Sequence, residues 1–326
     1  MKRFLTTFAI FILLAVLATT APADSFGTGD NQFTLEFVSI SASTNPTPAQ
    51  TIAVGLDGFG IVEYDYRMGT YEITNDQWDK FLANLAPVTV AGDPSSAYDE
   101  SASYTGTYVP TNRVSWYEGA QFVNWLNTST GHQAAYKFTG TQGQSDYTFA
   151  TWDTADAWGG TNLYRHKDAY YFLPDEDEWF KAAYWNGTSI QDYATKSGDT
   201  LHQGDGESGM GWNYYFGIYA TDPPGPWNVG SGSEELNGTY DMMGNVWEWM
   251  ESPSSDPSYT AGSLRGLRGG CWEDFLSNLS ASNHGSSSPS IEFSSRGFRV
   301  ASVPEPGSIT LLLCGLASLI CWRRHK

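Results

Sequence analysis

The stretch from Asp241 to Met250, DMMGNVWEWM, is the sequence feature that most constrains what this chain can fold into. It combines the carboxylates of Asp241 and Glu248 with a flexible glycine, Gly244, and two tryptophans. Oxygen ligands suit calcium, and a glycine lets the backbone turn so that its carbonyls face an ion. The stretch therefore predicts a loop that is held in shape by a bound metal ion, and not a helix or a strand. A tryptophan-rich turn with surface acids is the alternative.

Residues 1–23 have the features of a secretory signal peptide. A basic start is followed by the apolar run Phe8–Leu17, and the segment ends with small residues at Ala21 and Ala23. We therefore expect the chain to be exported.

Residues 303–326 form a tail of a different kind. Pro304-Glu305-Pro306 precedes a short apolar run, Ile309–Trp322, and a basic end. The tail resembles the PEP-CTERM sorting signal of Gram-negative bacteria. That resemblance implies recognition by an exosortase, transient membrane association through the short helix, cleavage near the Pro-Glu-Pro, and delivery to the cell surface or extracellular matrix. A plain C-terminal anchor is the alternative.

Charge and cysteine content limit the chemistry that the exported part can perform. The chain carries 17 basic and 36 acidic residues, a net charge of -19, and loss of its basic ends would make the balance more acidic. Such a balance argues against nucleic acid or an anionic membrane surface as a partner. Cys314 and Cys321 lie in the tail, so Cys271 is alone and no internal disulfide is expected. A core built from 13 Trp, 19 Tyr and 17 Phe, with bound ions, would have to supply stability.

The middle of the chain is expected to be an N-terminal strand and linker, residues 24–57, followed by one domain, residues 58–302. Phe33–Ile40 is the predicted strand, and Ser41–Gln50 reads as a loop. Further loops are predicted where Gly, Ser, Asp and Pro accumulate, at Thr139–Asp146, Ser197–Gly211 and Asp222–Gly238. Loops this long inside a domain are usually functional or held by metals.

Three helix starts share the spacing of a capping box, with a small oxygen acceptor three residues before Glu or Gln. They are Thr74 with Gln77, Ser115 with Glu118, and Asp175 with Glu178. Apolar residues at helical intervals follow each of them: Trp78, Phe81, Leu82 and Leu85; Trp116, Ala120, Val123 and Leu126; and Trp179, Ala182 and Ala183. A few helices among short strands and long loops predict an α+β fold.

Six blocks in this order resemble those of the formylglycine-generating enzyme, or sulfatase-modifying factor, family. The blocks are Asp65–Asn75 (DYRMGTYEITN), Val114–Leu126 (VSWYEGAQFVNWL), Phe172–Ala183 (FLPDEDEWFKAA), Asp241–Trp249, Leu267–Trp272 (LRGGCW) and Arg296–Ala301 (RGFRVA). The resemblance implies a compact C-type-lectin-like α+β fold, low in regular structure and held by calcium.

The family's calcium sites can be placed on this sequence by the same resemblance. It assigns the best-defined site to side-chain oxygens of Asp241 and Glu248 and backbone carbonyls of Gly244 and Val246. Asp241 stands where the family usually has Asn. A second site would include Asn213 and the carbonyl of Tyr214.

The resemblance breaks at the family's catalytic cysteines, which bind copper(I) as a pair of thiolates. Asp274 and Leu279 occupy those two positions, and Cys271 falls three residues too early. Copper(I) requires soft thiolate ligands, so we expect no copper and no oxidase activity. We interpret Cys271 as a small buried residue beside a tryptophan, in preference to a reactive thiol.

Two hypotheses about function remain. The first is a calcium-stabilised binding or structural module, in which a groove binds a peptide or glycan through the candidates Arg268, Cys271, Trp272, Asp274 and Arg296. The second is an enzyme of altered chemistry, with Asp274 or Glu273 as a base. Arg268 and Arg296 are equally consistent with buried arginines that tie loops together. The acidic run Asp175–Glu178 is interpreted as a helix N-terminus in preference to a carboxylate pair for glycoside hydrolysis.

Overall fold

The computed structural model describes residues 23–304, except 54, 57, 85–101, 143 and 255–257. The α-helices are α1 (Pro48–Ala53), α2 (Asn75–Ala83), α3 (Trp116–Ser129) and α4 (Glu176–Tyr184), and two 3-10 helices are η1 (Gly29–Asn31) and η2 (Leu276–Leu279). The strands are β1 (Ala23–Phe26), β2 (Phe33–Ile40), β3 (Tyr66–Gly69), β4 (Lys137–Thr139), β5 (Thr148–Ala150), β6 (Ala157–Trp158), β7 (Asn162–His166), β8 (Tyr171–Phe172), β9 (Trp247–Pro253), β10 (Arg265–Arg268), β11 (Gly285–Ser287), β12 (Arg296–Gly297) and β13 (Ala301–Ser302).

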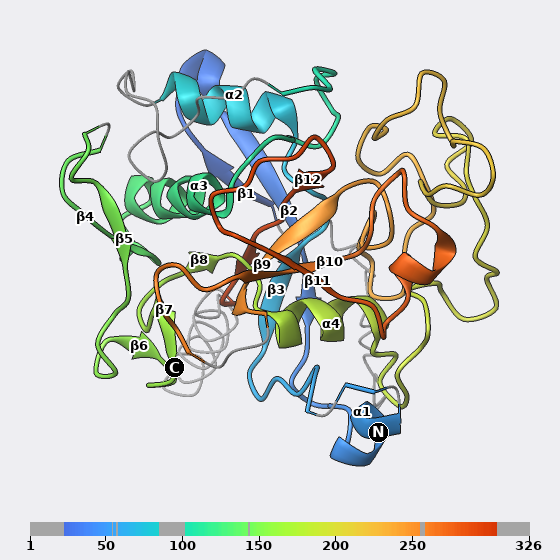
Figure 1. Cartoon of the computed structure of the whole chain (residues 1–326), viewed down its shortest axis with the longest axis horizontal. Coiled ribbons are helices and arrows are strands. Elements are labelled where there is room, and N and C mark those ends of the chain that lie inside the picture. Colours follow the sequence, from blue (N-terminus) through green and yellow to red (C-terminus); the bar gives the residue numbers. More distant parts are fainter. Residues whose placement is uncertain are drawn as a thin grey trace, which may run out of the picture.

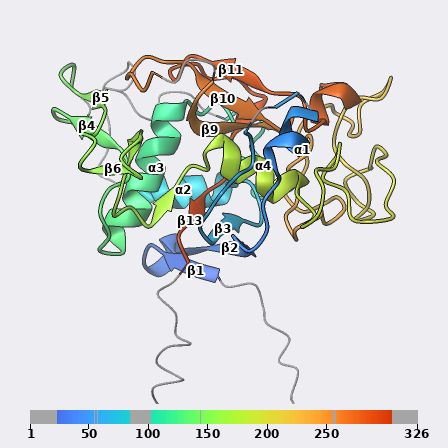
Figure 2. The ribbon, with the colours of Figure 1, turned by 90° about the horizontal axis from the view of Figure 1, so that it is seen from below.

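Two larger sheets organise these strands. One is antiparallel, in the order β1-β2-β3-β13-β8, and the other has the order β11-β10-β9-β12 with β12 parallel to β9. Figure 1 shows α2 and α3 on one side of the strands and α4 on the other, and in Figure 2 the two sheets lie at opposite faces of the molecule. Few helices, short strands and long loops confirm the predicted α+β fold.

The three predicted helix starts are confirmed in atomic detail. Thr74, Ser115 and Asp175 are the N-caps of α2, α3 and α4, and each forms both hydrogen bonds of a capping box. Phe81, Leu126 and Trp179 lie in the core, as predicted. Leu82 is partly buried and packs against the core, and Leu85 lies outside the described residues. Local sequence chemistry therefore determines where these helices begin.

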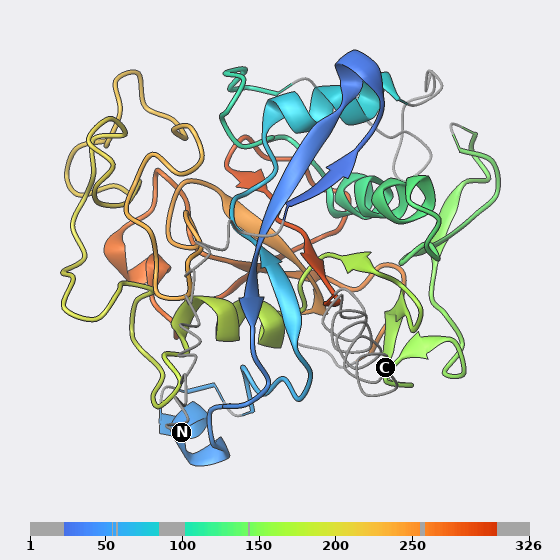
Figure 3. The ribbon, with the colours of Figure 1, turned by 180° about the vertical axis from the view of Figure 1, so that it is seen from behind.

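The N-terminal segment belongs to the main sheet, so its description as a strand with a linker was incomplete. Strand β2 has the predicted bounds and pairs with β3 from Phe37 opposite Gly69 to Ile40 opposite Tyr66. Strand β1 pairs with β2 and begins at Ala23, the last residue of the predicted signal peptide. Figure 3 shows these three strands side by side. Alternate side chains of β2 face the core, which explains why the strand cannot lie apart from the domain.

Helix α1 corrects the predicted loop at Ser41–Gln50. It begins at Pro48, and a capping box precedes it: the Gln50 backbone N–H donates to the Thr47 hydroxyl, and the Thr47 N–H donates to the Gln50 side chain. The same signal that located the other helices was present here, together with proline at the first helical position.

Residues 185–246, between α4 and β9, contain no helix or strand and are joined to the rest of the fold by isolated bridges. This long connection includes two of the predicted loops and is the yellow-to-orange region of Figure 1. Buried aromatic side chains hold it to the domain, among them Trp212, Tyr214 and Trp227. It carries several of the predicted site residues.

Across the described part of the chain, no helix has the length and apolar character needed to cross a bilayer. Residues 1–22 of the predicted signal peptide and residues 305–326 of the predicted sorting tail lie outside the described residues.

Candidate functional site

The stretch from Asp241 to Met250 is half loop and half strand, which corrects the prediction of a loop throughout. Asp241, Gly244 and Asn245 have positive φ angles, so the first half turns sharply. A Cβ on Gly244 would lie 2.1 Å from the Asn213 carbonyl oxygen, and only glycine fits there. From Trp247 onward the chain is β9, where Trp249 pairs with Leu267. Pairing with β10 satisfies backbone groups that a buried loop would leave unpaired.

Both predicted carboxylate ligands are buried and accept hydrogen bonds from protein groups. Asp241 accepts from the indole N–H of Trp227 at 2.8 Å and the backbone N–H of Gly230 at 2.7 Å. Glu248 accepts from Arg299 through Nε at 2.7 Å and Nη2 at 2.5 Å, and from the indole of Trp179 at 2.7 Å. A guanidinium thus already neutralises Glu248.

Carboxyl groups outnumber basic side chains around Arg299. Besides Asp241 and Glu248, Glu72 and Glu235 are buried close enough to Arg299 to interact with it electrostatically. Burial raises the pKa of Glu235 to about 8 and the pKa of Glu72 well above its usual range. The Arg299 guanidinium also donates hydrogen bonds to the carbonyls of Gly69, Thr70 and Tyr240. Four carboxyl groups therefore share a single buried guanidinium.

The two predicted calcium positions lie against each other. Asn213 forms a parallel bridge with Gly244, and its carbonyl accepts from Asn245 N–H at 2.9 Å. The Asn213 side-chain oxygen is buried without a hydrogen-bond partner, whereas the carbonyl of Tyr214 accepts from Gln203 at 2.6 Å. An unpaired buried oxygen beside several carboxyl groups fits a hard cation.

Side-chain carboxylates alone would not hold such an ion. Among the residues that the structure describes, no group of three or more His, Cys, Asp or Glu side chains is arranged to bind a metal. A cation at this position would need the amide oxygen of Asn213 and backbone carbonyls such as those of Gly244 and Val246. The fit is better at Asn213 than at Glu248, because Arg299 is already bound to Glu248.

Asp274 and Leu279, which the resemblance places at the family's cysteine positions, both have structural roles in this chain. One oxygen of Asp274 accepts from the backbone N–H of Cys271 at 3.0 Å and from its thiol at 3.1 Å, and the other accepts from the amide of Asn278. Leu279 is fully buried in the core. Burial and the nearby Asp274 raise the pKa of the Cys271 thiol far above its ordinary value. Cys271 is a buried free thiol, as its interpretation from sequence proposed.

The two arginines among the predicted groove residues are held by contacts within the fold. Arg268 is fully buried and bonded to Glu176 and the carbonyls of Ala281 and Asn283, so its position does not support a ligand contact. Arg296 is half-buried, stacks over Phe293 at 4.3 Å and donates to Ser287. These two arginines tie loops together, which was the alternative interpretation.

Trp272 is the groove candidate that lies next to a surface with exposed apolar side chains. It is largely buried, but its ring contacts Tyr104 and Tyr219, with centroids 5.8 and 5.5 Å apart. Tyr219 belongs to a loop whose neighbouring apolar side chains are exposed. This loop was not predictable from the sequence, because its residues differ little from the many aromatic residues of the core.

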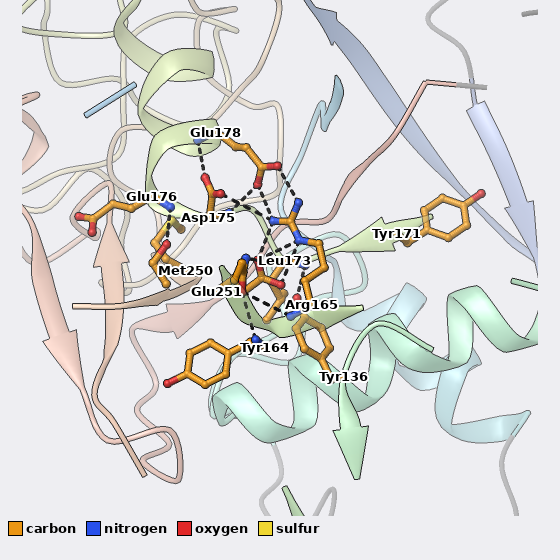
Figure 4. A network of polar contacts seen from close by, with 12 residues as sticks. Tyr136, Tyr164, Arg165, Tyr171, Leu173, Asp175, Glu176, Glu178, Met250 and Glu251 are labelled. Atoms are coloured by element: carbon orange, nitrogen blue, oxygen red, sulfur yellow. Dashed lines mark hydrogen bonds and ion pairs between the residues drawn. The ribbon is translucent and has the colours of Figure 1, made fainter. Parts of the chain in front are cut away.

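The acidic start of α4 belongs to a buried ionic network (Figure 4). Glu178 binds Arg165 through two hydrogen bonds of 2.8 Å, and Arg165 also binds Glu251 at 2.6 Å. Asp175 caps the helix, as the interpretation as a helix N-terminus requires. Arg165 and Glu251 were not identified from the sequence, where nothing distinguishes them from solvent-exposed charges.

One cavity lies elsewhere, between the strands β1 and β2 and the start of α2. It has a volume of about 620 Å³, and its lining includes Glu36, Tyr71, Asp76 and Tyr108. None of the site residues predicted from the sequence lines it.

Comparisons with known proteins agree with this architecture. The chaperone protein LppX of Paenibacillus barcinonensis is 25% identical over 225 residues, which is 64% of this chain and 69% of that protein. Treponema denticola variable protein 1 has a similar fold, with a TM-score of 0.57 and 19% identity over 87% of this chain and 100% of its own. CarF gives a TM-score of 0.57 with 19% identity over 83% and 99% of the two chains. PvdO from Pseudomonas aeruginosa gives 0.52 with 17% identity over 88% and 100%.

The sequence model of a protein family, the sulfatase-modifying factor enzyme 1-like domain, matches residues 54–303 of this chain. This range spans most of the described chain, from just after α1 to the end of β13. The chain therefore belongs to the sulfatase-modifying factor enzyme 1-like domain family.

Proposed function

We propose that this protein is an exported, calcium-stabilised binding or structural module that has lost the oxidase chemistry of its family. One observation carries the proposal: Asp274 and Leu279, which the resemblance places at the family's cysteine positions, each have a structural role. Asp274 closes a turn on Cys271, and Leu279 fills the core. A pair of thiolates, which copper(I) requires, has no counterpart there.

The remaining thiol supports the same proposal. Cys271 is buried, and the carboxylate of Asp274 beside it disfavours the thiolate form. An enzyme of altered chemistry is the second candidate, with Asp274 or Glu273 as a base. Asp274 accepts hydrogen bonds on both oxygens, and this geometry favours the first candidate over a base that must take up a proton. Glu273 is exposed.

Export and sorting remain part of the proposal. Residues 1–23 would direct secretion, and an exosortase would process the tail near Pro304–Pro306. Those sequence signals support a location at the cell surface or in the extracellular matrix of a Gram-negative bacterium. Mass spectrometry of the secreted protein would reveal both cleavage points.

The purified mature protein is expected to leave a cysteine-containing sulfatase peptide unchanged in the presence of copper and oxygen. The reason is that a single buried thiol cannot form the two-coordinate copper site. Mass spectrometry of the peptide would detect the loss of sulfur that accompanies aldehyde formation. An active family enzyme serves as the positive control, and peptide turnover by this chain above the copper-only background would contradict the proposal.

Calcium is expected to remain bound after dialysis, and its removal is expected to lower the melting temperature. A ligand present at about 100 times its dissociation constant stabilises a fold by about 2.7 kcal/mol, which corresponds to roughly 5 to 10 °C for a domain of this size. Elemental analysis and thermal unfolding with a chelator would measure both effects. Calcium, but not magnesium, should restore the melting temperature. Absence of bound calcium together with an unchanged melting temperature would exclude the calcium site without affecting the oxidase result.

A further inference from the structure

Two neighbouring loops present an exposed apolar surface next to Trp272. Phe216 and Ile218 are each 69% exposed, Phe275 is 61% exposed and Tyr219 is 43% exposed. We call these four residues, with Tyr215 and Trp272, the aromatic ridge. Large exposed apolar side chains gathered in one place usually mark an interaction surface, because exposing them to water is unfavourable.

The aromatic ridge is held in shape by contacts between its two loops. The backbone N–H of Tyr215 donates to the carbonyl of Asp274 at 2.8 Å, and Tyr215 forms a bridge with Phe275. Ring centroids are 5.2 Å apart for Tyr215 and Phe275, and 5.0 Å apart for Tyr215 and Tyr219. A surface that is already ordered loses little conformational entropy when it binds a partner.

The first loop of the aromatic ridge lies in a stretch of sequence that has acidic residues but no basic ones. The sequence contains no Lys or Arg between Lys196 and Arg265, a stretch that includes the whole first loop. Exposed acids border both loops, with Asp222 following Tyr219 and Glu273 following Trp272. Glu273 lies close enough to Tyr104, which packs on Trp272, to contribute to a raised Tyr104 pKa. The ridge therefore combines aromatic faces with exposed carboxylates in a chain of net charge -19.

We propose that the aromatic ridge binds an arginine- or lysine-rich peptide segment of a partner protein. Guanidinium and ammonium groups are attracted to aromatic faces, and arginine also stacks on them. Glu273 and Asp222 would pair with neighbouring basic side chains, and the acidic surface would steer a basic segment toward the ridge. The inference rests on the proposed function, since it names the partner class of a binding module.

Calorimetric titration with a blocked nine-residue peptide of alternating glycine and arginine tests this proposal. Wild-type protein should bind it, and affinity should fall at least tenfold in the double variant Phe216→Ser, Phe275→Ser. Glu273→Gln should weaken binding and reduce its salt dependence. Both altered phenylalanines are mainly exposed, so the melting temperature should stay close to that of the wild type. The matched control is Ile52→Ser, which removes a 58% exposed side chain from α1 and should bind like the wild type.

Two comparison ligands make the result decisive. The same peptide with citrulline in place of arginine keeps the shape but not the charge, and it should bind at least tenfold more weakly. The proposal would be overturned if the two peptides bound equally well, or if the ridge variant bound the arginine peptide as tightly as the Ile52→Ser control. It would also be overturned if the ridge bound a neutral oligosaccharide and no peptide. The oxidase and calcium measurements are independent of these outcomes, so failure at the ridge is distinguishable from failure of the proposed function.

Discussion

Replacement of Arg165 by methionine is expected to lower the free energy of unfolding by about 3 to 5 kcal/mol. Arg165 is completely buried, and so are Glu178 and Glu251, the two carboxylates that accept hydrogen bonds from it. Methionine fills a similar volume but leaves both acids without a counter-ion. Removing one partner of a buried ion pair costs far more than the pair itself contributes, because the remaining charge is poorly solvated.

The surroundings of Arg165 offer little alternative solvation. Asn162 donates to Glu251 at 2.6 Å and Tyr64 donates to Glu178 at 2.6 Å, but neither neutralises a charge. The guanidinium also lies 3.6 Å from the centre of the Phe172 ring, so the substitution removes packing as well.

Chemical denaturation of the Arg165→Met variant would measure the loss. Lys167→Met is the matched control, because Lys167 forms an exposed ion pair with Asp156 and should cost less than about 1 kcal/mol. In the Arg165→Met background, Glu251→Gln should recover part of the loss by removing one uncompensated charge. A variant within about 1 kcal/mol of wild type would show that the network does not stabilise the fold.

Replacement of Arg299 by methionine is expected to have a comparable effect, also about 3 to 5 kcal/mol in the presence of chelator. Arg299 is the guanidinium shared by Glu72, Glu235, Asp241 and Glu248. It also links β3 and the loop before β9, through the carbonyls of Gly69 and Tyr240. Its loss leaves four buried carboxyl groups with hydrogen-bond donors but no positive charge.

The loss of unfolding free energy in the Arg299→Met variant, relative to wild type, should become smaller as the pH is lowered from about 8 to about 5. A buried carboxyl group whose pKa is raised takes up its proton more readily in the folded than in the unfolded state, so folding is favoured as the pH falls toward the unfolded pKa. The pKa of Glu235 is already raised to about 8 by burial. Losing Arg299 removes an interaction that lowers it.

Unfolding curves of wild type and Arg299→Met across that pH range provide the measurement. Lys196→Met removes an exposed ion pair with Glu234 and should show neither the large loss nor the pH-dependent recovery. A deficit that stays constant with pH would mean that the variant suffers from lost packing or lost carbonyl contacts, and not from uncompensated charge. Partial rescue of the variant by added calcium would indicate a cation near Glu248.

Some elements of this fold depend on local sequence and others on tertiary contacts. Thr74, Ser115 and Asp175 could be identified as helix starts because capping depends on residues three positions apart. The same rule would have located α1 through Thr47 and Gln50. The change from loop to strand at Trp247 was not predictable from local pattern, since the hydrogen-bond partners of β9 come from β10, nearly twenty residues away.

By itself, the sequence determined the family, the α+β class and the helix starts. Each of these depends on residue identity and short spacing. Tertiary structure alone decided that Arg268 faces α4, that Arg165 neutralises Glu178 and Glu251, and that Phe216 and Phe275 share one exposed surface. Whether a charge is buried or an aromatic ring exposed depends on segments distant in the chain, which only folding brings together.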